Sequence, residues 1–317
     1  MILNFFYNIW LLTNNYKLLL ILLPEWIVMS GPSSTNLSAT LAKSLNYELH
    51  EVETKSFPDG EKKIRINEDV QGKNIIFVQS LYPPVDHHVM QFLLTVYKLS
   101  QMGSKVYACV PYLAYARQDL EFQRGETASL AVISRLFRSI GVNSLLTVDI
   151  HSTHGLGYFS FPTFSVSAIP LLANYVSNNI KLNSPLAVSP DFGGSSRVEA
   201  FSKLLNIDYI SLKKSRSRTT GEVVMEDSNV EVAGRDIILV DDMISTGTSI
   251  VRAANYLHKL NSGKIITLCT HALMVNNASD VIKEAGVETV IATNTIPSDV
   301  SKVDVTKIIA EHYKSIQ

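Results

Sequence analysis

From residue 26 onward, short apolar runs alternate with segments whose apolar residues recur at helical spacing. The first pattern is typical of strands buried on both faces, and the second of helices that pack on a sheet. The runs predict strands over Trp26–Ser30, Ile75–Ser80, Val106–Pro111, Leu145–Asp149, Leu186–Ser189, Ile237–Asp241, Ile265–Thr270 and Val290–Thr293. The helical spacing predicts helices over Asp86–Met102, Ser129–Ile140, Ser195–Leu205 and Ser249–Leu260. This alternation favours an α/β fold of mainly parallel sheets flanked by helices.

The length of 317 residues suits two domains that each bury their own core. No low-complexity or charged linker separates them, so the stretch 155–167, which contains Gly, Pro and Phe, is the best candidate boundary. We expect a first domain over 26–162 and a second over 163–317, with the last residues packing on the first domain.

Residues 1–25 do not fit this pattern. Their apolar positions are interrupted by Asn and Lys residues, and no clean apolar run approaches the ~20 residues of a membrane helix. No positive charge precedes Lys17, whereas a signal peptide begins with one. We expect an extension outside the fold that results from a misassigned start codon, with a membrane-surface anchor as the alternative.

Charge and cysteine usage narrow the class of protein. The 28 Lys and Arg residues nearly balance 29 Asp and Glu residues, for a net charge of -1. No whole-chain field therefore attracts nucleic acid or an anionic membrane, and we expect neither as a partner. Cys109 and Cys269 each lie in an apolar run, which predicts two buried thiols and a cytoplasmic protein.

The most informative segment follows the predicted strand at 237–241. Two carboxylates, Asp241 and Asp242, precede a loop of small and hydroxyl residues, which are Ser245, Thr246, Gly247, Thr248 and Ser249. Backbone N–H groups of such a loop, together with a helix N-terminus, bind phosphate. The carboxylates can accept hydrogen bonds from sugar hydroxyls or from metal-bound water.

This segment resembles the motif that binds phosphoribosyl pyrophosphate (PRPP) in type I phosphoribosyltransferases and ribose-phosphate pyrophosphokinases. The resemblance implies a ribose 5-phosphate site. It does not by itself distinguish an enzyme that makes PRPP from one that consumes it.

Four further segments resemble the pyrophosphokinases and are absent from the transferases. They are Phe57–Glu61, Tyr115–Asp119, Asp149–His154 and Ser189–Arg197. An aromatic residue and two carboxylates around a Gly turn suit adenine recognition, and an arginine fork suits phosphate. Glycines between a strand and a helix allow the backbone to approach a pyrophosphate.

A basic segment, Leu212–Arg218, lies beside Thr219, Thr220 and Gly221. By itself such a run indicates a solvated face or a mobile loop. Family members carry Lys-x-Arg on such a loop, and Lys214–Ser215–Arg216 matches this pattern best, particularly that of the shorter archaeal-type members. The resemblance therefore implies that Lys214 and Arg216 are catalytic, with Lys213 as a rival for the lysine.

The resemblance covers nearly all of the chain after residue 25. It implies a ribose-phosphate diphosphokinase with two phosphoribosyltransferase-like domains, which converts ATP and ribose 5-phosphate to AMP and PRPP for nucleotide biosynthesis. Mg²⁺ is the expected cofactor, and a homo-oligomer, dimer or higher, is expected.

The resemblance also implies the site residues. Those expected to bind ATP are Phe57, Asp59, Gly60, Glu61, Arg117, Gln118 and His151. Those expected to bind ribose 5-phosphate are Arg216, Asp241, Asp242, Ser245, Thr246, Gly247, Thr248 and Ser249. His151 and Asp191 are the expected metal contacts.

Two alternatives remain open from the sequence. A type I phosphoribosyltransferase would need the phosphate loop but neither segment 57–61 nor segment 115–119. A non-catalytic regulatory subunit would keep the fold without the chemistry, although the charged residues of every motif are intact.

Overall fold

The computed structural model describes residues 24–216, 223–226 and 230–316, and only the backbone of 214–216 and 223–226. The expected N-terminal extension therefore lies almost entirely outside the described residues. Within them, no helix combines the length and the apolar character needed to cross a membrane.

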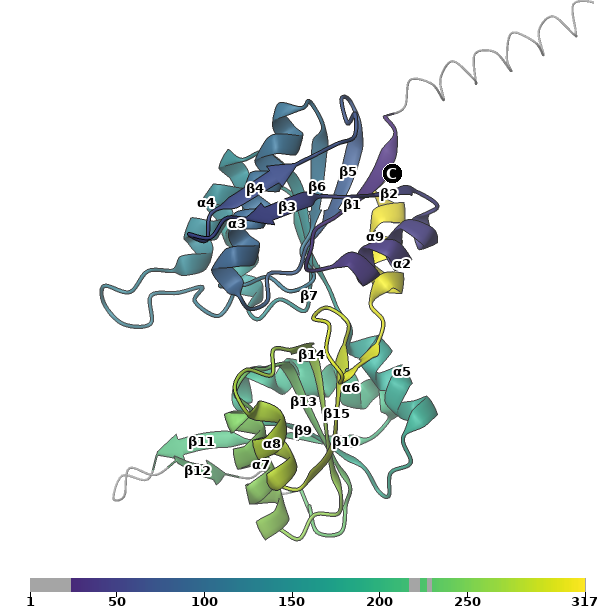
Figure 1. The fold of residues 1–317 in the computed structure, drawn as a ribbon. Helices are drawn as coiled ribbons and strands as arrows, with labels where there is room; N and C mark the ends of the chain where they lie inside the picture. Colours follow the sequence, from purple (N-terminus) through teal and green to yellow (C-terminus); the bar gives the residue numbers. More distant parts are fainter. Residues whose placement is uncertain (1–23, 217–222, 227–229, 317) are drawn as a thin grey trace, which may run out of the picture.

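The first half of the chain forms one parallel sheet (Figure 1). In spatial order its strands are β2 (Glu48–Glu51), β1 (Trp26–Ser30), β5 (Asn74–Val78), β6 (Lys105–Cys109), β7 (Val142–Val148) and β8 (Thr163–Val166). The flanking helices are α2 (Thr35–Leu45), α3 (Val85–Gln101) and α4 (Ser129–Ser139). The sheet is buried on both faces, since every residue of the inner strand β5 is buried.

The second half repeats this arrangement. Its parallel strands, in order, are β10 (Asp208–Ser211), β9 (Leu186–Ser189), β13 (Ile237–Ile244), β14 (Ile265–Ala272), β15 (Val287–Thr293) and β16 (Ser301–Val303). Its helices are α5 (Ile169–Asn179), α6 (Ser195–Leu205), α7 (Thr248–Lys259) and α8 (Ala278–Glu284). The predicted α/β class with mainly parallel sheets is confirmed.

The ends of the two halves show where one stops and the other begins. Strand β8 pairs with β7 of the first sheet, so a boundary between residues 162 and 163 would separate it from its sheet, and we propose a boundary after Val166. Helix α9 (Thr306–Ser315) follows β16 of the second sheet but packs on α2 of the first half (Figure 1). Its Tyr313 is buried against the first-half core, which fixes the returning helix.

Two antiparallel hairpins lie outside the main sheets. One pairs β3 (Glu53–Ser56) with β4 (Lys62–Arg65), and β4 contacts α3. The other pairs β11 (Lys213–Arg216) with β12 (Val223–Glu226) and projects from the second half (Figure 1). Short edge elements of this kind lack a strong apolar pattern, and the sequence prediction contained none of these four strands.

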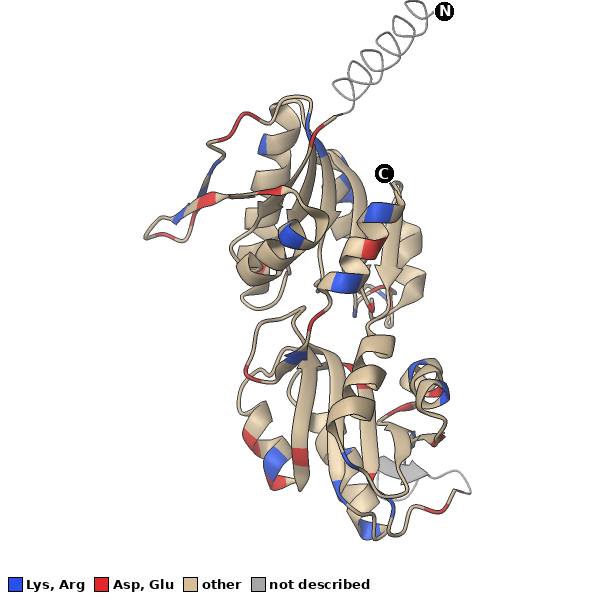
Figure 2. Cartoon of the chain, turned by 90° about the vertical axis from the view of Figure 1, so that its right-hand side faces the viewer, with Lys and Arg blue, Asp and Glu red and all other residues tan. Residues whose placement is uncertain are grey.

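Charged side chains of both signs are dispersed over both halves (Figure 2). This agrees with the balanced composition. Charge is therefore considered locally, at the edge where the two halves meet.

Candidate active site

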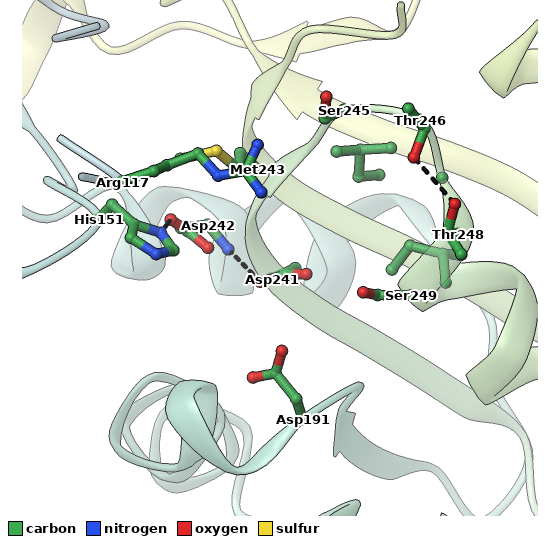
Figure 3. A pocket seen from close by; sticks show the side chains of 13 residues that line it. Arg117, His151, Asp191, Asp241, Asp242, Met243, Ser245, Thr246, Thr248 and Ser249 are labelled. Atoms are coloured by element: carbon green, nitrogen blue, oxygen red, sulfur yellow. Dashed lines mark hydrogen bonds and ion pairs between the residues drawn. The ribbon is translucent and has the colours of Figure 1, made fainter. Parts of the chain in front are cut away.

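The expected ribose and metal residues other than Arg216 meet in one pocket between the halves (Figure 3). Its cavity measures about 150 Å³. The second half contributes the carboxylates and the loop after β13, and the first half contributes Arg117 and His151. The lining residues are Arg117, His151, Asp191, Asp241, Asp242, Met243, Ile244, Ser245, Thr246, Gly247, Thr248, Ser249 and Ile250.

The two carboxylates lie within β13, because this strand continues to Ile244 instead of ending at Asp241 as predicted. Strand β14 is equally long and pairs with β13 as far as Ile244, so the backbone polar groups beside the carboxylates have partners. The carboxylates therefore stand on a rigid element and not on a turn.

Asp241 and Asp242 have different electrostatic surroundings. Burial and the Asp242 carboxylate raise the pKa of Asp241 well above its usual range, although Arg197 opposes this shift. Burial alone would raise the pKa of Asp242, but the hydrogen bond from His151 and the charge of Arg197 hold it well below its usual range. Asp242 is therefore the firmly ionised member of the pair.

His151 reaches this pair from the first half. It follows β7 and lies just before the short 3₁₀ helix η1 (Thr153–Tyr158). Its Nδ1 is 2.6 Å from Oδ2 of Asp242, while Nε2 makes no hydrogen bond with the described residues. Because Nδ1 faces the carboxylate, Nε2 is the ring nitrogen that points away from Asp242.

The loop after β13 has the geometry of a phosphate site. Gly247 has φ +77°, and a Cβ there would lie 2.8 Å from Cγ1 of Ile282, so only glycine fits. Helix α7 begins at the next residue, which directs its first N–H groups toward the pocket. The hydroxyls of Thr246 and Thr248 lie 2.9 Å apart, on the side of the pocket away from His151 (Figure 3).

The donor set fits a magnesium ion that is also held by substrate. Asp191 and the β13 carboxylates offer oxygen ligands in one pocket, and His151 offers Nε2. Among the described residues, no three or more His, Cys, Asp or Glu side chains form a metal cluster by themselves. This agrees with the usual behaviour of Mg²⁺, which takes one or two carboxylates and completes its shell with water and phosphate oxygens.

The two expected ATP segments are placed differently. Arg117 lines the pocket and is exposed. Gln118 does not line it, and its Nε2 donates to the carbonyl of Leu120, 3.2 Å away, and to Glu126. Gln118 therefore holds its own loop together in this state.

Phe57, Asp59, Gly60 and Glu61 form the turn between β3 and β4, and none of them lines the pocket. The backbone N–H of Phe57 donates to the Glu61 carbonyl over 2.8 Å, and Asp59 accepts from the Glu61 N–H. Phe57 is 39% exposed. The hairpin thus presents a preformed aromatic and acidic tip to solvent, away from the pocket of its own chain.

The basic segment is described only in part. The side chains of Lys214 and Arg216 lie outside the described part of the chain, and their backbone belongs to β11. Nζ of Lys213 lies 5.5 Å from the ring centroid of Phe192, which directly follows Asp191. The start of β11 therefore lies beside the Asp191 loop.

Sequence reasoning assigned no role to Arg197. Its Nη1 lies 3.6 Å from Oδ1 of Asp241 and 3.5 Å from Oδ1 of Asp242. A signal was present in the sequence, because a cation in the first turn of a helix opposes the helix dipole and needs another reason to be there. That reason is the carboxylate pair on β13.

Comparison with known proteins agrees with this site. Residues 26–141 match the family described as the N-terminal domain of ribose phosphate pyrophosphokinase, and residues 218–314 match the phosphoribosyl synthetase-associated domain. The ribose-phosphate pyrophosphokinase of Sulfurisphaera tokodaii is 36% identical over 284 residues, which cover 89% of this chain and 97% of that protein. The chain belongs to the ribose-phosphate pyrophosphokinase family.

Other relatives support the same assignment. The ribose-phosphate pyrophosphokinase of Methanothermobacter thermautotrophicus is 36% identical over 290 residues, 91% of this chain and all of that protein. The crystal structure of phosphoribosylpyrophosphate synthetase from Mycobacterium smegmatis superposes with a TM-score of 0.83 at 26% identity, covering 92% of this chain and 98% of that one. The expected resemblance to this family, including its archaeal members, is confirmed.

Proposed function

We propose that this chain is a ribose-phosphate diphosphokinase, which transfers the pyrophosphate of ATP to the 1-hydroxyl of ribose 5-phosphate and releases AMP. The observation that carries the proposal is the meeting of a phosphate loop and two carboxylates from one half with Arg117 and His151 from the other. A transferase would need only the loop and the carboxylates. A regulatory subunit would not need an intact set of charged residues in one pocket.

In this proposal the second half holds the sugar. The loop from Ser245 to Ser249 binds the 5-phosphate through backbone N–H groups, hydroxyls and the N-terminus of α7. The carboxylate side of β13 accepts hydrogen bonds from the ribose hydroxyls. Because these groups are fixed by paired strands, they orient the 1-hydroxyl before reaction.

In the same proposal, the first half and the Asp191 loop bind the nucleotide. Arg117 binds phosphate oxygens, and His151 and Asp191 would hold Mg²⁺ together with the triphosphate. When bound, this ion would neutralise charge that develops on the phosphoryl oxygens. The residues of the chain contribute mainly position and charge, and none of those the structure describes is placed as a general base.

Lys214 and Arg216 are proposed to stabilise the migrating group. We expect Lys214→Ala and Arg216→Ala each to lower kcat by about a hundredfold or more, because such contacts strengthen as charge develops. ATP binding should stay within about threefold by calorimetry. Lys213→Ala is the matched control, and a larger loss of kcat for this variant would transfer the role to Lys213.

The reaction itself is tested with purified protein, ATP, ribose 5-phosphate and Mg²⁺, with AMP and PRPP quantified in equal amounts. Omitting every nucleobase excludes a phosphoribosyltransferase as the source of signal. Absence of AMP and PRPP from a folded, substrate-binding protein would favour the regulatory subunit instead.

A homo-oligomer is part of the proposal. It is supported by the tip Phe57–Glu61, which carries the expected adenine contacts but does not line the pocket of its own chain. A second copy that donates this tip would complete the ATP site. Light scattering should show a dimer or larger, and mixing inactive Phe57→Ala and Lys214→Ala chains should restore part of the activity.

A cytoplasmic location also remains a proposal. It is supported by Cys109 and Cys269, which are both free and fully buried, as is usual in a reducing compartment. Cell fractionation with an antibody to the native chain tests it.

A further inference from the structure

Asp242 has both carboxylate oxygens engaged by the protein. Oδ2 accepts a hydrogen bond from Nδ1 of His151 over 2.6 Å, and Oδ1 lies 3.5 Å from Nη1 of Arg197. Its side chain is only 5% exposed. A sugar hydroxyl that approached this carboxylate would compete with His151 and Arg197 for a side chain that is almost fully buried.

Asp241 is placed differently. Its side chain is three times as exposed, at 15%, and points into the pocket between Asp191 and Ser249 (Figure 3). Its Oδ1 accepts the backbone N–H of Asp242 over 2.9 Å and lies 3.6 Å from Nη1 of Arg197, while its Oδ2 makes no hydrogen bond with the described residues. This carboxylate is therefore oriented toward arriving substrate.

We infer that Asp242 is a positioning residue that links the two halves by fixing the His151 ring for the nucleotide, whereas Asp241 receives the ribose hydroxyls. The inference rests on the proposed function and divides the roles of its two carboxylates. Asp242 holds Nδ1 and so directs Nε2 of His151 toward the nucleotide and its ion. A carboxylate behind a metal-binding histidine commonly sets the ring tautomer and orientation.

This arrangement has an unusual consequence for substrate binding. Asp242 belongs to the strand that supports the ribose site, yet removing its carboxylate should weaken binding of the nucleotide. Nη1 of Arg197 lies near both carboxylates, so it stabilises their relative placement but does not distinguish between them.

The test measures the affinity of each substrate separately in two matched variants. Asp242→Asn and Asp241→Asn both replace one carboxylate oxygen by an amide without changing volume. For Asp242→Asn, calorimetry should show Mg²⁺ with a non-hydrolysable ATP analogue binding about tenfold more weakly. Ribose 5-phosphate binding should change by less than about threefold.

The opposite pattern is expected for Asp241→Asn, with the larger loss for ribose 5-phosphate. If Asp242→Asn weakens ribose 5-phosphate most and spares the nucleotide, Asp242 is a direct sugar ligand and the inference is wrong. If the wild type forms no AMP and PRPP, or binds neither substrate, the proposed function itself has failed.

A double-mutant cycle separates positioning from a general structural defect. His151→Ala and Asp242→Asn should weaken nucleotide binding non-additively, because the second change removes a partner already lost. His151→Ala with Asp241→Asn should be close to additive. Additivity in both cycles would contradict the link between His151 and Asp242.

A measurement on the wild type covers the case in which Asp242→Asn does not fold. The chain has eight histidines. The ring signals of His151 are those present in the ¹⁵N spectrum of the wild type and absent from that of His151→Ala. Ribose 5-phosphate should leave these signals unchanged, because the bond to Asp242 persists. A shift that saturates with ribose 5-phosphate would show that the sugar displaces His151, which would overturn the inference.

Discussion

The two halves of the molecule share a strand order but use the ends of equivalent strands differently. Strands β5 and β13 are third in their sheets. Val78 of β5 pairs with Ser30, the last residue of β1, and Leu239 of β13 pairs with Val188, one residue before the end of β9. Gln79 and Ser80 in the first half therefore occupy the places of Asp241 and Asp242 in the second.

The segments that follow β5 and β13 also differ in their ability to bind phosphate. After β5 the chain continues through Pro83 and Pro84, which lack backbone N–H groups and cannot surround a phosphate. Ser80 is fully buried, and its hydroxyl donates to the carbonyl of Thr295 in the second half over 2.5 Å. At equivalent strand ends, one scaffold thus carries the pocket carboxylates in one half and a structural contact in the other, so the side chains at the sheet edge decide the function.

Asp241→Asn tests the catalytic side of this comparison. Ribose 5-phosphate should bind about ten- to a hundredfold more weakly, because an oxygen that accepts hydrogen bonds from the sugar is replaced by an amide N–H group, which only donates. ATP should be affected less. Calorimetry with each substrate measures both effects, and equal losses for the two would contradict the placement of the carboxylate beside the sugar.

Gly247→Ala tests the phosphate loop. The added methyl group would meet Ile282 at φ +77°, so ribose 5-phosphate affinity should fall by about tenfold and stability by about 1–2 kcal/mol. Gly72→Ala is the matched control, because Gly72 has φ +74° with nothing within 4 Å. That variant should lose similar stability but keep the wild-type KM. A rise in KM for both variants would show that the effect is not specific to the phosphate loop.

Ser80→Ala tests the structural side. It leaves the N–H of Tyr112 and the carbonyl of Thr295 without their buried partner, so unfolding by urea should show a loss of about 1–3 kcal/mol. KM values should stay close to those of the wild type. Ser139→Ala, which removes an exposed hydroxyl, should be neutral, and a large kinetic effect of Ser80→Ala would place the first-half strand end in the site.

The smallest expected effect concerns pH. The pKa of Asp241 is raised in the folded chain by burial and by Asp242, so its ionisation costs folding stability. That cost is absent below the unfolded pKa and complete above the folded one. The melting temperature of Asp241→Asn should therefore exceed that of the wild type near neutral pH, with a difference that shrinks toward pH ~4. A difference independent of pH would indicate another cause.

The buried strands could be predicted because burial on both faces gives each strand a short run of apolar residues. Trp26–Ser30 and Leu186–Ser189 match β1 and β9, and the helix Ser195–Leu205 matches α6. The edge strands and the two hairpins could not be predicted. Their apolar and polar residues alternate only weakly, and the strands are stabilised by contacts outside their own segment. The last residues were expected to pack on the first domain, but the helical form of α9 was missed, because its burial depends on α2.

The sequence alone determined the family, the α/β class and the chemical types of the site residues, because motifs and apolar periodicity are local properties of the chain. Only the tertiary structure decided which of these residues meet. It brought His151 to Asp242 across 91 positions, added Arg197 to the carboxylates, and left the tip at Phe57 outside the pocket. The physical reason is that burial and charge pairing depend on distances between elements, which sheet order and strand register set and a linear sequence does not display.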